Sequence, residues 1–161
     1  MTRRQLRTIH LTGAVVALLA VGTFMAATLA VEVSGDEDLI AAVKEVIARA
    51  VFLLAPVMIA TGLSGRRLAG KSRAAVVVRK MRRMRLIGLN AVVVLIPCAL
   101  TLAHLAADRD FGPSFMALQS VELMAGGVNV TLLALNMRDG FALRTRGQRL
   151  RSKEVGSGAR S

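Results

Sequence analysis

The chain has 161 residues, of which 54% are hydrophobic, and it carries a formal net charge of +12. A soluble domain of this size would have difficulty burying so much apolar surface. The single cysteine, Cys98, excludes an intrachain disulfide and a Cys-x-x-Cys redox or zinc site. The chain contains no Trp and no Tyr, which weighs against base-stacking surfaces for single-stranded nucleic acid.

Residues 8–31 contain no charged residue and predict a first membrane span, because a helix needs about 20 apolar residues to cross a bilayer. A cleaved signal peptide is the competing interpretation, since Thr28-Leu29-Ala30 resembles a small-residue cleavage site. The apolar core of a signal peptide is only about 7 to 15 residues long. The greater length of this run favours an uncleaved span.

The next segment, residues 32–45, is acidic and turn-like, and we expect a loop there. Residues 46–65 form a second predicted span in which Arg49 is the only charged residue. Residues 66–85 then carry nine Lys or Arg and no acid. We expect this basic segment to connect the second and third spans.

The second half of the chain repeats this alternation of apolar and charged segments. Residues 86–107 form a third, uncharged span, and residues 108–113 form a short turn-rich connection. Residues 114–137 form a fourth span with a single charge, Glu122. The tail, residues 144–161, is basic and contains Gly and Ser, which predicts disorder.

The distribution of basic residues predicts the orientation of the spans. Of the 22 Lys and Arg, three precede the first span, nine lie in residues 66–85 and seven follow the fourth span. If all four spans cross, these segments share one side and the acidic residues 32–45 lie on the other. Basic segments face the cytoplasm in membrane proteins. The sequence therefore predicts an all-α, four-transmembrane-helix bundle over residues 1–143, in the cell membrane, with both termini cytoplasmic.

This topology also explains the basic segment, residues 66–85, without a nucleic-acid partner. We expect the segment to contact anionic lipid headgroups, each Lys or Arg contributing about 1 kcal/mol near the surface.

The polar residues of each span fall on one helical face, since they are spaced by three or four positions. In the first two spans the faces are His10, Gly13, Ala17 and Ala20, and then Glu45, Arg49, Phe52 and Pro56. In the last two they are Asn90, Val94, Pro97, Thr101 and His104, and then Gln119, Glu122, Gly126, Asn129, Leu133 and Asn136. Polar side chains in lipid turn toward neighbouring helices, so we expect these faces to line the interior of the bundle.

Arg49, His104 and Glu122 are expected at similar depths in the outer leaflet, counting about 20 residues from the basic edge of each span. Intramembrane ionisable residues are functional candidates, and this cluster would suit a proton or cation relay. Two structural alternatives stay open. The cluster can be a structural ion pair near the headgroups. Alternatively, Glu45 pairs with Arg49 at i, i+4, and Glu122 then pairs with His104.

The uncharged polar residues are interpreted as interhelical contacts rather than ligands: Gln119, Asn90, Asn129 and Asn136. Pro56 and Pro97 are expected to kink their helices.

No catalytic residue, metal site or cofactor is predicted. The chain has no serine, cysteine or metal-protease motif and no phosphate loop, and its methionines show no ligand spacing. We expect a non-catalytic subunit, assembly factor or scaffold of a membrane complex. The alternative is a small oligomeric transporter or channel for protons, cations or a small solute. The expected partners are the bilayer, a second copy of the chain or another membrane subunit.

Overall fold

The computed structural model of the chain describes residues 1–70 and 75–158, and side chains within these ranges as far as Gly140. The described residues are almost entirely helical, as predicted. The elements are α1 (Arg3–Ser34), α2 (Glu37–Ala69), α3 (Ala75–Asn90), the π-helix η1 (Ala91–Leu95), α4 (Ile96–Ala107) and α5 (Pro113–Gly158). Four helical segments in these ranges are long and apolar enough to cross a membrane: Arg3–Ser34, Glu37–Ala69, Ala75–Ala107 and Pro113–Gly140.

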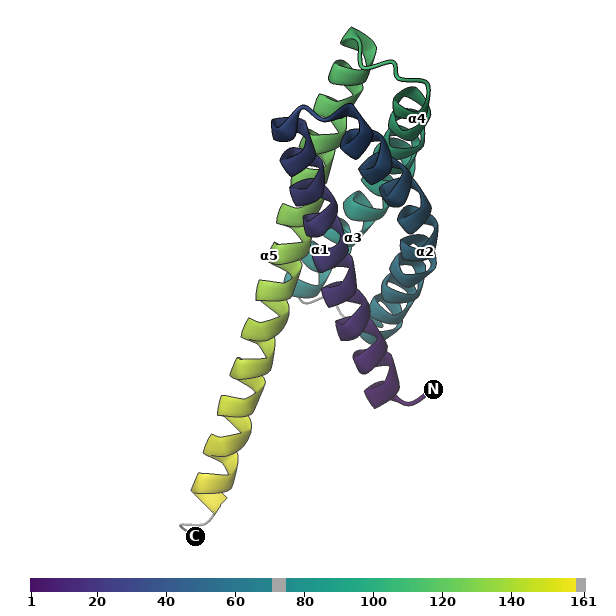
Figure 1. The fold of residues 1–161 in the computed structure, drawn as a ribbon. Helices are drawn as coiled ribbons and strands as arrows, with labels where there is room; N and C mark the ends of the chain where they lie inside the picture. The colour runs from purple at the N-terminus through teal and green to yellow at the C-terminus, as the bar shows by residue number, and fades with distance from the viewer. Residues whose placement is uncertain (71–74, 159–161) are drawn as a thin grey trace.

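The helices alternate in direction, as Figure 1 shows. α1 leads away from the N-terminus, α2 returns, α3 and α4 run outward again, and α5 returns and continues beyond the bundle to the C-terminus. The starts of α1 and α3 and the end of α2 therefore lie at one end of the bundle, and α5 runs out past this end. α1 packs along α2, and α5 contacts α1, α3 and α4.

The acidic segment, residues 32–45, is not the loop that its composition predicts. α1 continues to Ser34, and only Gly35 and Asp36 separate it from α2. Gly35 has a φ of 66°, which suits glycine at a helix end, and Asp36 caps α2 by accepting hydrogen bonds from the N–H groups of the next residues. Acidic residues are stabilising in a first helical turn, so they extend α2 instead of forming a loop.

The helices also extend into the basic segment and the tail. α2 runs to Ala69 and α3 starts at Ala75, while residues 71–74 lie outside the described residues. α5 continues through Gly140 to Gly158, where the sequence predicts a helix end and a disordered tail. No proline follows Pro113, and a glycine within a helix costs only about 1 kcal/mol. The last three residues of the predicted tail, 159–161, also lie outside the described residues.

The two predicted kink sites differ in their local structure. Pro97 follows the π-helical turn η1, in which the Ile96 N–H bonds to the Ala91 carbonyl five residues earlier. A proline has no N–H and its ring clashes with the carbonyl four residues before it, and the wider turn accommodates both constraints. Pro56 lies within α2, which bows along its length in Figure 1.

The π-helical turn rotates the buried face of the third span. An extra residue in one turn moves every later side chain by one position around the helix. The buried residues after the turn are Cys98, Ala99, Leu102 and Ala106, and the expected Thr101 and His104 are exposed. The predicted face of this span is correct before η1, where Asn90 is partly buried, and wrong after it.

The second span is rotated as well, whereas the first and fourth spans bury the predicted faces. In α2 the predicted residues Glu45, Arg49, Phe52 and Pro56 are all exposed. The buried residues at the start of α2 are Ile40, Lys44, Ile47 and Ala48. In α1 and α5 the buried residues that match the prediction are His10, Gly13, Ala17, Gln119, Gly126, Asn129, Leu133 and Asn136.

The apolar core has two clusters at different levels of the bundle. Ile40, Leu102, Ala106 and Phe115 pack near the α1–α2 turn and the α4–α5 connection. Ala17, Ile87 and Leu133 pack nearer the termini. The second cluster, Ala17, Ile87 and Leu133, also lines the cavity described next.

Candidate functional site

A buried ion pair joins α2 to α5. The Lys44 Nζ lies 2.6 Å from Glu122 Oε2, and the two side chains are 0% and 13% exposed. A charged side chain in a membrane interior is costly unless it is paired. The pair leaves no net charge at this point of the bundle and fixes α2 against α5.

The other two members of the expected cluster lie elsewhere. Arg49 forms an ion pair with Glu45 on its own helix, and its side chain is 75% exposed. His104 Nε2 lies 3.6 Å from Asp108 Oδ2, also on its own helix, and its side chain is 76% exposed. The structure therefore does not bring Arg49, His104 and Glu122 together. The rotated faces of α2 and α4 turn the first two outward. The expected Glu45–Arg49 pair matches the geometry, but the expected pairing of Glu122 with His104 does not, because Glu122 binds Lys44.

Sequence reasoning missed Lys44, which is the partner of Glu122. Lys44 lies within the acidic segment 32–45, for which the composition predicts a loop and not a span. Its spacing from Ile40, Ile47 and Ala48 would have placed it on an apolar helical face. A lysine on such a face indicates a buried acidic partner, and Glu122 is the one acid of the fourth predicted span.

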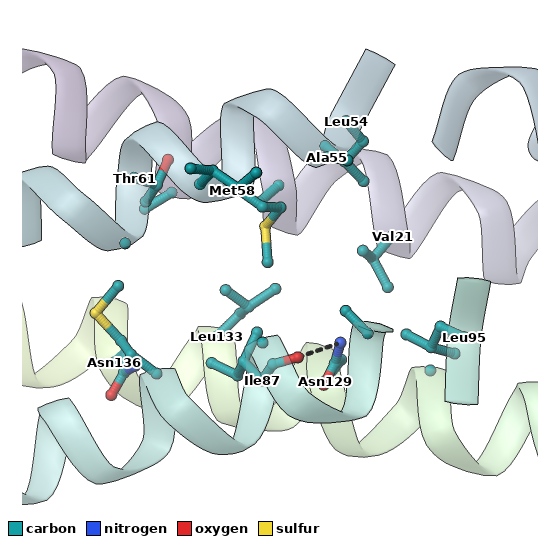
Figure 2. Close-up of a pocket in the computed structure, with 18 of the residues that line it drawn as sticks. Val21, Leu54, Ala55, Met58, Thr61, Ile87, Leu95, Asn129, Leu133 and Asn136 are labelled. Atoms are coloured by element: carbon teal, nitrogen blue, oxygen red, sulfur yellow. Dashed lines mark hydrogen bonds between the residues drawn. The ribbon is translucent and has the colours of Figure 1, made fainter. Parts of the chain in front are cut away.

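Asparagines join α3 to α5. Asn90 Nδ2 donates to Asn129 Oδ1 and to the Ala125 carbonyl, both at 2.9 Å, and Asn129 Nδ2 donates to the Ile87 carbonyl at 3.5 Å. Figure 2 shows the Asn129–Ile87 contact as a dashed line. Asn129 is almost completely buried, so these bonds satisfy polar atoms that have no access to water.

Gln119 and Asn136 are buried without comparable partners. Neither amide atom of Gln119 has a hydrogen-bond partner among the described residues, and the same is true of Asn136 Oδ1. A buried unpaired polar atom is costly, so each of these side chains is a candidate for an additional contact.

A second polar network joins α1 to α2. The Thr61 carbonyl accepts from His10 Nδ1 at 2.9 Å and from Ser64 Oγ at 3.0 Å. A carbonyl oxygen can only accept, so Nδ1 carries a proton in this contact. The approach is close: a Cβ on Gly13 would lie 2.0 Å from Thr61 Oγ1, and one on Gly65 would lie 2.8 Å from His10 Cε1. Glycine is required at both positions.

A cavity of about 700 Å³ separates the α1–α2 pair from α3, η1 and α5. Figure 2 shows Val21, Leu54 and Met58 on one side, and Ile87, Leu95 and Leu133 on the other. Most of its lining is apolar, and the polar lining residues include Arg7, His10, Lys80, Asn129 and Asn136. Its volume lies within the range of about 300 to 1,000 Å³ that is typical of small-molecule sites.

The searched part of the chain contains no group of three or more His, Cys, Asp or Glu side chains that could hold a metal ion. Lys44 and Glu122, and Asn90 and Asn129, pair between helices, and most of the cavity lining is apolar. The chain matches no protein-family model, no curated protein and no solved structure.

Proposed function

We propose that the chain is a multi-pass protein of the cell membrane, with both termini in the cytoplasm, and that it acts as a non-catalytic subunit or scaffold. The observation that supports this most is the local pairing of its charges. Lys44 neutralises Glu122, and Arg49 is paired with Glu45. A bundle in which the two charges of the predicted spans, Arg49 and Glu122, each have a separate partner is suited to structural and binding roles rather than to moving protons or cations.

The length of α5 supports a role in binding partners. The helix leaves the bundle and continues as a single element beyond it (Figure 1). Its extension, residues 141–158, carries five basic residues in the sequence and one acid. A helix with a basic sequence on the proposed cytoplasmic side is a suitable contact for an acidic surface of another protein.

Purification from native membranes in a mild detergent tests the proposed role. The full chain should retain a partner protein in constant proportion, and a variant that ends at Gly140 should retain less of it. The bundle of the truncated variant should keep its thermal stability, which separates loss of binding from loss of folding. A chain that purifies only with copies of itself contradicts the subunit proposal.

Cysteine labelling on intact cells tests the proposed orientation. In a Cys98→Ser background, Val33→Cys should react with an impermeant maleimide, because Val33 is exposed at the end of α1 opposite to the termini. Ser152→Cys should react only after the cells are opened. The reverse pattern would show that the proposed orientation is wrong.

The alternative is a small oligomeric transporter, and the cavity is the feature that supports it. Because most of the lining is apolar, the solute would be a largely apolar small molecule rather than an ion. Reconstituted vesicles should then show flux of such a solute that a cavity-filling substitution abolishes, whereas the subunit proposal predicts no flux.

A further inference from the structure

The cavity between the α1–α2 pair and the other helices has a long apolar part and one cationic end. Apolar side chains line it over most of its length, on α1, α2, α3, η1 and α5. Arg7 and Lys80 line it at the end of the bundle that carries the termini. Glu122 also lines it, but Lys44 neutralises that carboxylate. This is the arrangement expected around a molecule with an apolar chain and an anionic head.

The two cationic groups at this end are not matched by acids. Among the described residues, neither Arg7 nor Lys80 forms an ion pair. Asp139 is the acid on the adjacent part of α5, and it is bound by Arg83 at 2.8 Å and by Arg79 at 3.4 Å. Asp139 also lies near Lys80, but it is shared with two arginines, so this end of the cavity has an excess of positive charge among the described residues.

Further hydrogen-bonding groups lie at the same end. Asn136 is buried and lines the cavity, and its Oδ1 has no partner among the described residues. His10 also lines the cavity, and because its Nδ1 donates to the Thr61 carbonyl, Nε2 is the ring atom left for another contact. Asn136 Oδ1 and the free His10 Nε2 both accept hydrogen bonds, so each can accept from a hydroxyl group of a bound head.

We propose that this cavity binds an anionic phospholipid of the cytoplasmic leaflet, with an acyl chain between the helices and the phosphate at Arg7 and Lys80. The inference rests on the proposed membrane insertion. Basic pockets between transmembrane helices on the cytoplasmic side suit anionic headgroups. Arginine binds phosphate through a planar fork, and lysine binds it as a point charge.

The headgroup part of the proposal is tested with two charge-matched variants of the full chain. Arg7→Gln/Lys80→Gln removes the cavity charges, and Arg4→Gln/Arg82→Gln removes one charge from each of the same helices at exposed positions that do not line the cavity. Each protein is placed in nanodiscs with equimolar phosphatidylglycerol and phosphatidylcholine. Lipid that stays bound after transfer to detergent is identified by native mass spectrometry.

The wild type and the Arg4→Gln/Arg82→Gln control should retain phosphatidylglycerol preferentially. Arg7→Gln/Lys80→Gln should lose roughly tenfold to thirtyfold of this preference, since each charge contributes about 1 kcal/mol near the surface. Equal preferences in the two variants, or equal retention of both lipids by the wild type, would overturn the proposal.

The acyl-chain part is tested with a filled cavity. Ala55→Phe places a ring in the cavity, while Ala60→Phe on the same helix is exposed and outside it. Ala55→Phe should reduce retention of both lipids and Ala60→Phe should not. Equal effects of the two substitutions would overturn the acyl-chain site. If Ala55→Phe does not fold, Ala55→Leu repeats the test with a smaller side chain.

The outcome is distinguishable from failure of the proposed function. Nanodiscs have no inside or outside, so lipid preference is measured independently of orientation in the cell. A chain that inserts as proposed and captures its partner, but shows no lipid preference, refutes the lipid site alone. If an alkaline wash removes the protein from native membranes, the membrane proposal itself is refuted.

Discussion

The ammonium group of Lys44 on α2 and the carboxylate of Glu122 on α5 lie 2.6 Å apart, and the lysine side chain is completely buried. The pair joins two helices that are far apart in the sequence. Removal of one partner leaves the other charge without compensation in a medium that cannot solvate it. Removal of both leaves two neutral side chains.

We therefore expect Glu122→Gln to lower the free energy of unfolding by about 3 to 5 kcal/mol, the usual cost of breaking a buried pair. The double variant Lys44→Met/Glu122→Gln should recover most of this loss. The measurement is the midpoint of unfolding in mixed micelles, and Arg49→Gln is the matched control. The Arg49–Glu45 pair is exposed and should contribute no more than about 0.5 kcal/mol. A double variant as unstable as Glu122→Gln would contradict the pairing.

Asn129 links α5 to α3 through Asn90 and the Ile87 carbonyl. Interhelical hydrogen bonds in membranes contribute about 0.6 kcal/mol on average and up to about 1.7. Asn129→Ala removes two of them, so we expect a loss of about 1 to 2 kcal/mol. Thr131→Val is the control on the same helix, because the Thr131 hydroxyl bonds only to the Gly127 carbonyl of its own helix. Equal losses in the two variants would refute the interhelical role of Asn129.

Gly13 allows α1 and α2 to approach closely at Thr61. A methyl group there would lie 2.0 Å from Thr61 Oγ1, so Gly13→Ala forces the helices apart. We expect overpacking to cost about 1 to 3 kcal/mol. Gly22→Ala on the same helix meets no atom within 4 Å and should be neutral, or stabilising by about 0.5 to 1 kcal/mol. Thermal unfolding of both variants in detergent measures the difference. A stable Gly13→Ala protein would show that the helices are not packed as described.

The π-helical turn before Pro97 determines which face of α4 is buried. Nitroxide labels at single cysteines in a Cys98→Ser background report this face through collisions with dissolved oxygen. We expect high oxygen accessibility at Thr101 and low accessibility at Leu102 and Ala106. An uninterrupted α-helix continuing the face of Asn90 would give the opposite order at Thr101 and Leu102, which makes the pair of labels decisive.

Local sequence properties determined the spans and two of the four buried faces. Four apolar runs of sufficient length predict four helices, because length and hydropathy are properties of each segment alone. Gln119, Asn129 and Asn136 were recognised on one face because α5 is an uninterrupted helix with a constant period. α1 has the same constant helical period, so the sequence predicts its buried residues His10, Gly13 and Ala17 on one face.

The tertiary structure decided how these helices meet. In α4 the constant period fails, since the turn before Pro97 adds a residue and brings Leu102 inward in place of Thr101. In α2 the apolar face of Ile40, Ile47 and Ala48 carries Lys44 inward, and Glu122 on α5 supplies the opposite charge there. The reason is physical: a buried charge is stable only beside its partner, and the partner's position depends on the packing of helices distant in sequence. The sequence alone determined the helices, and their packing determined the ion pair and the cavity.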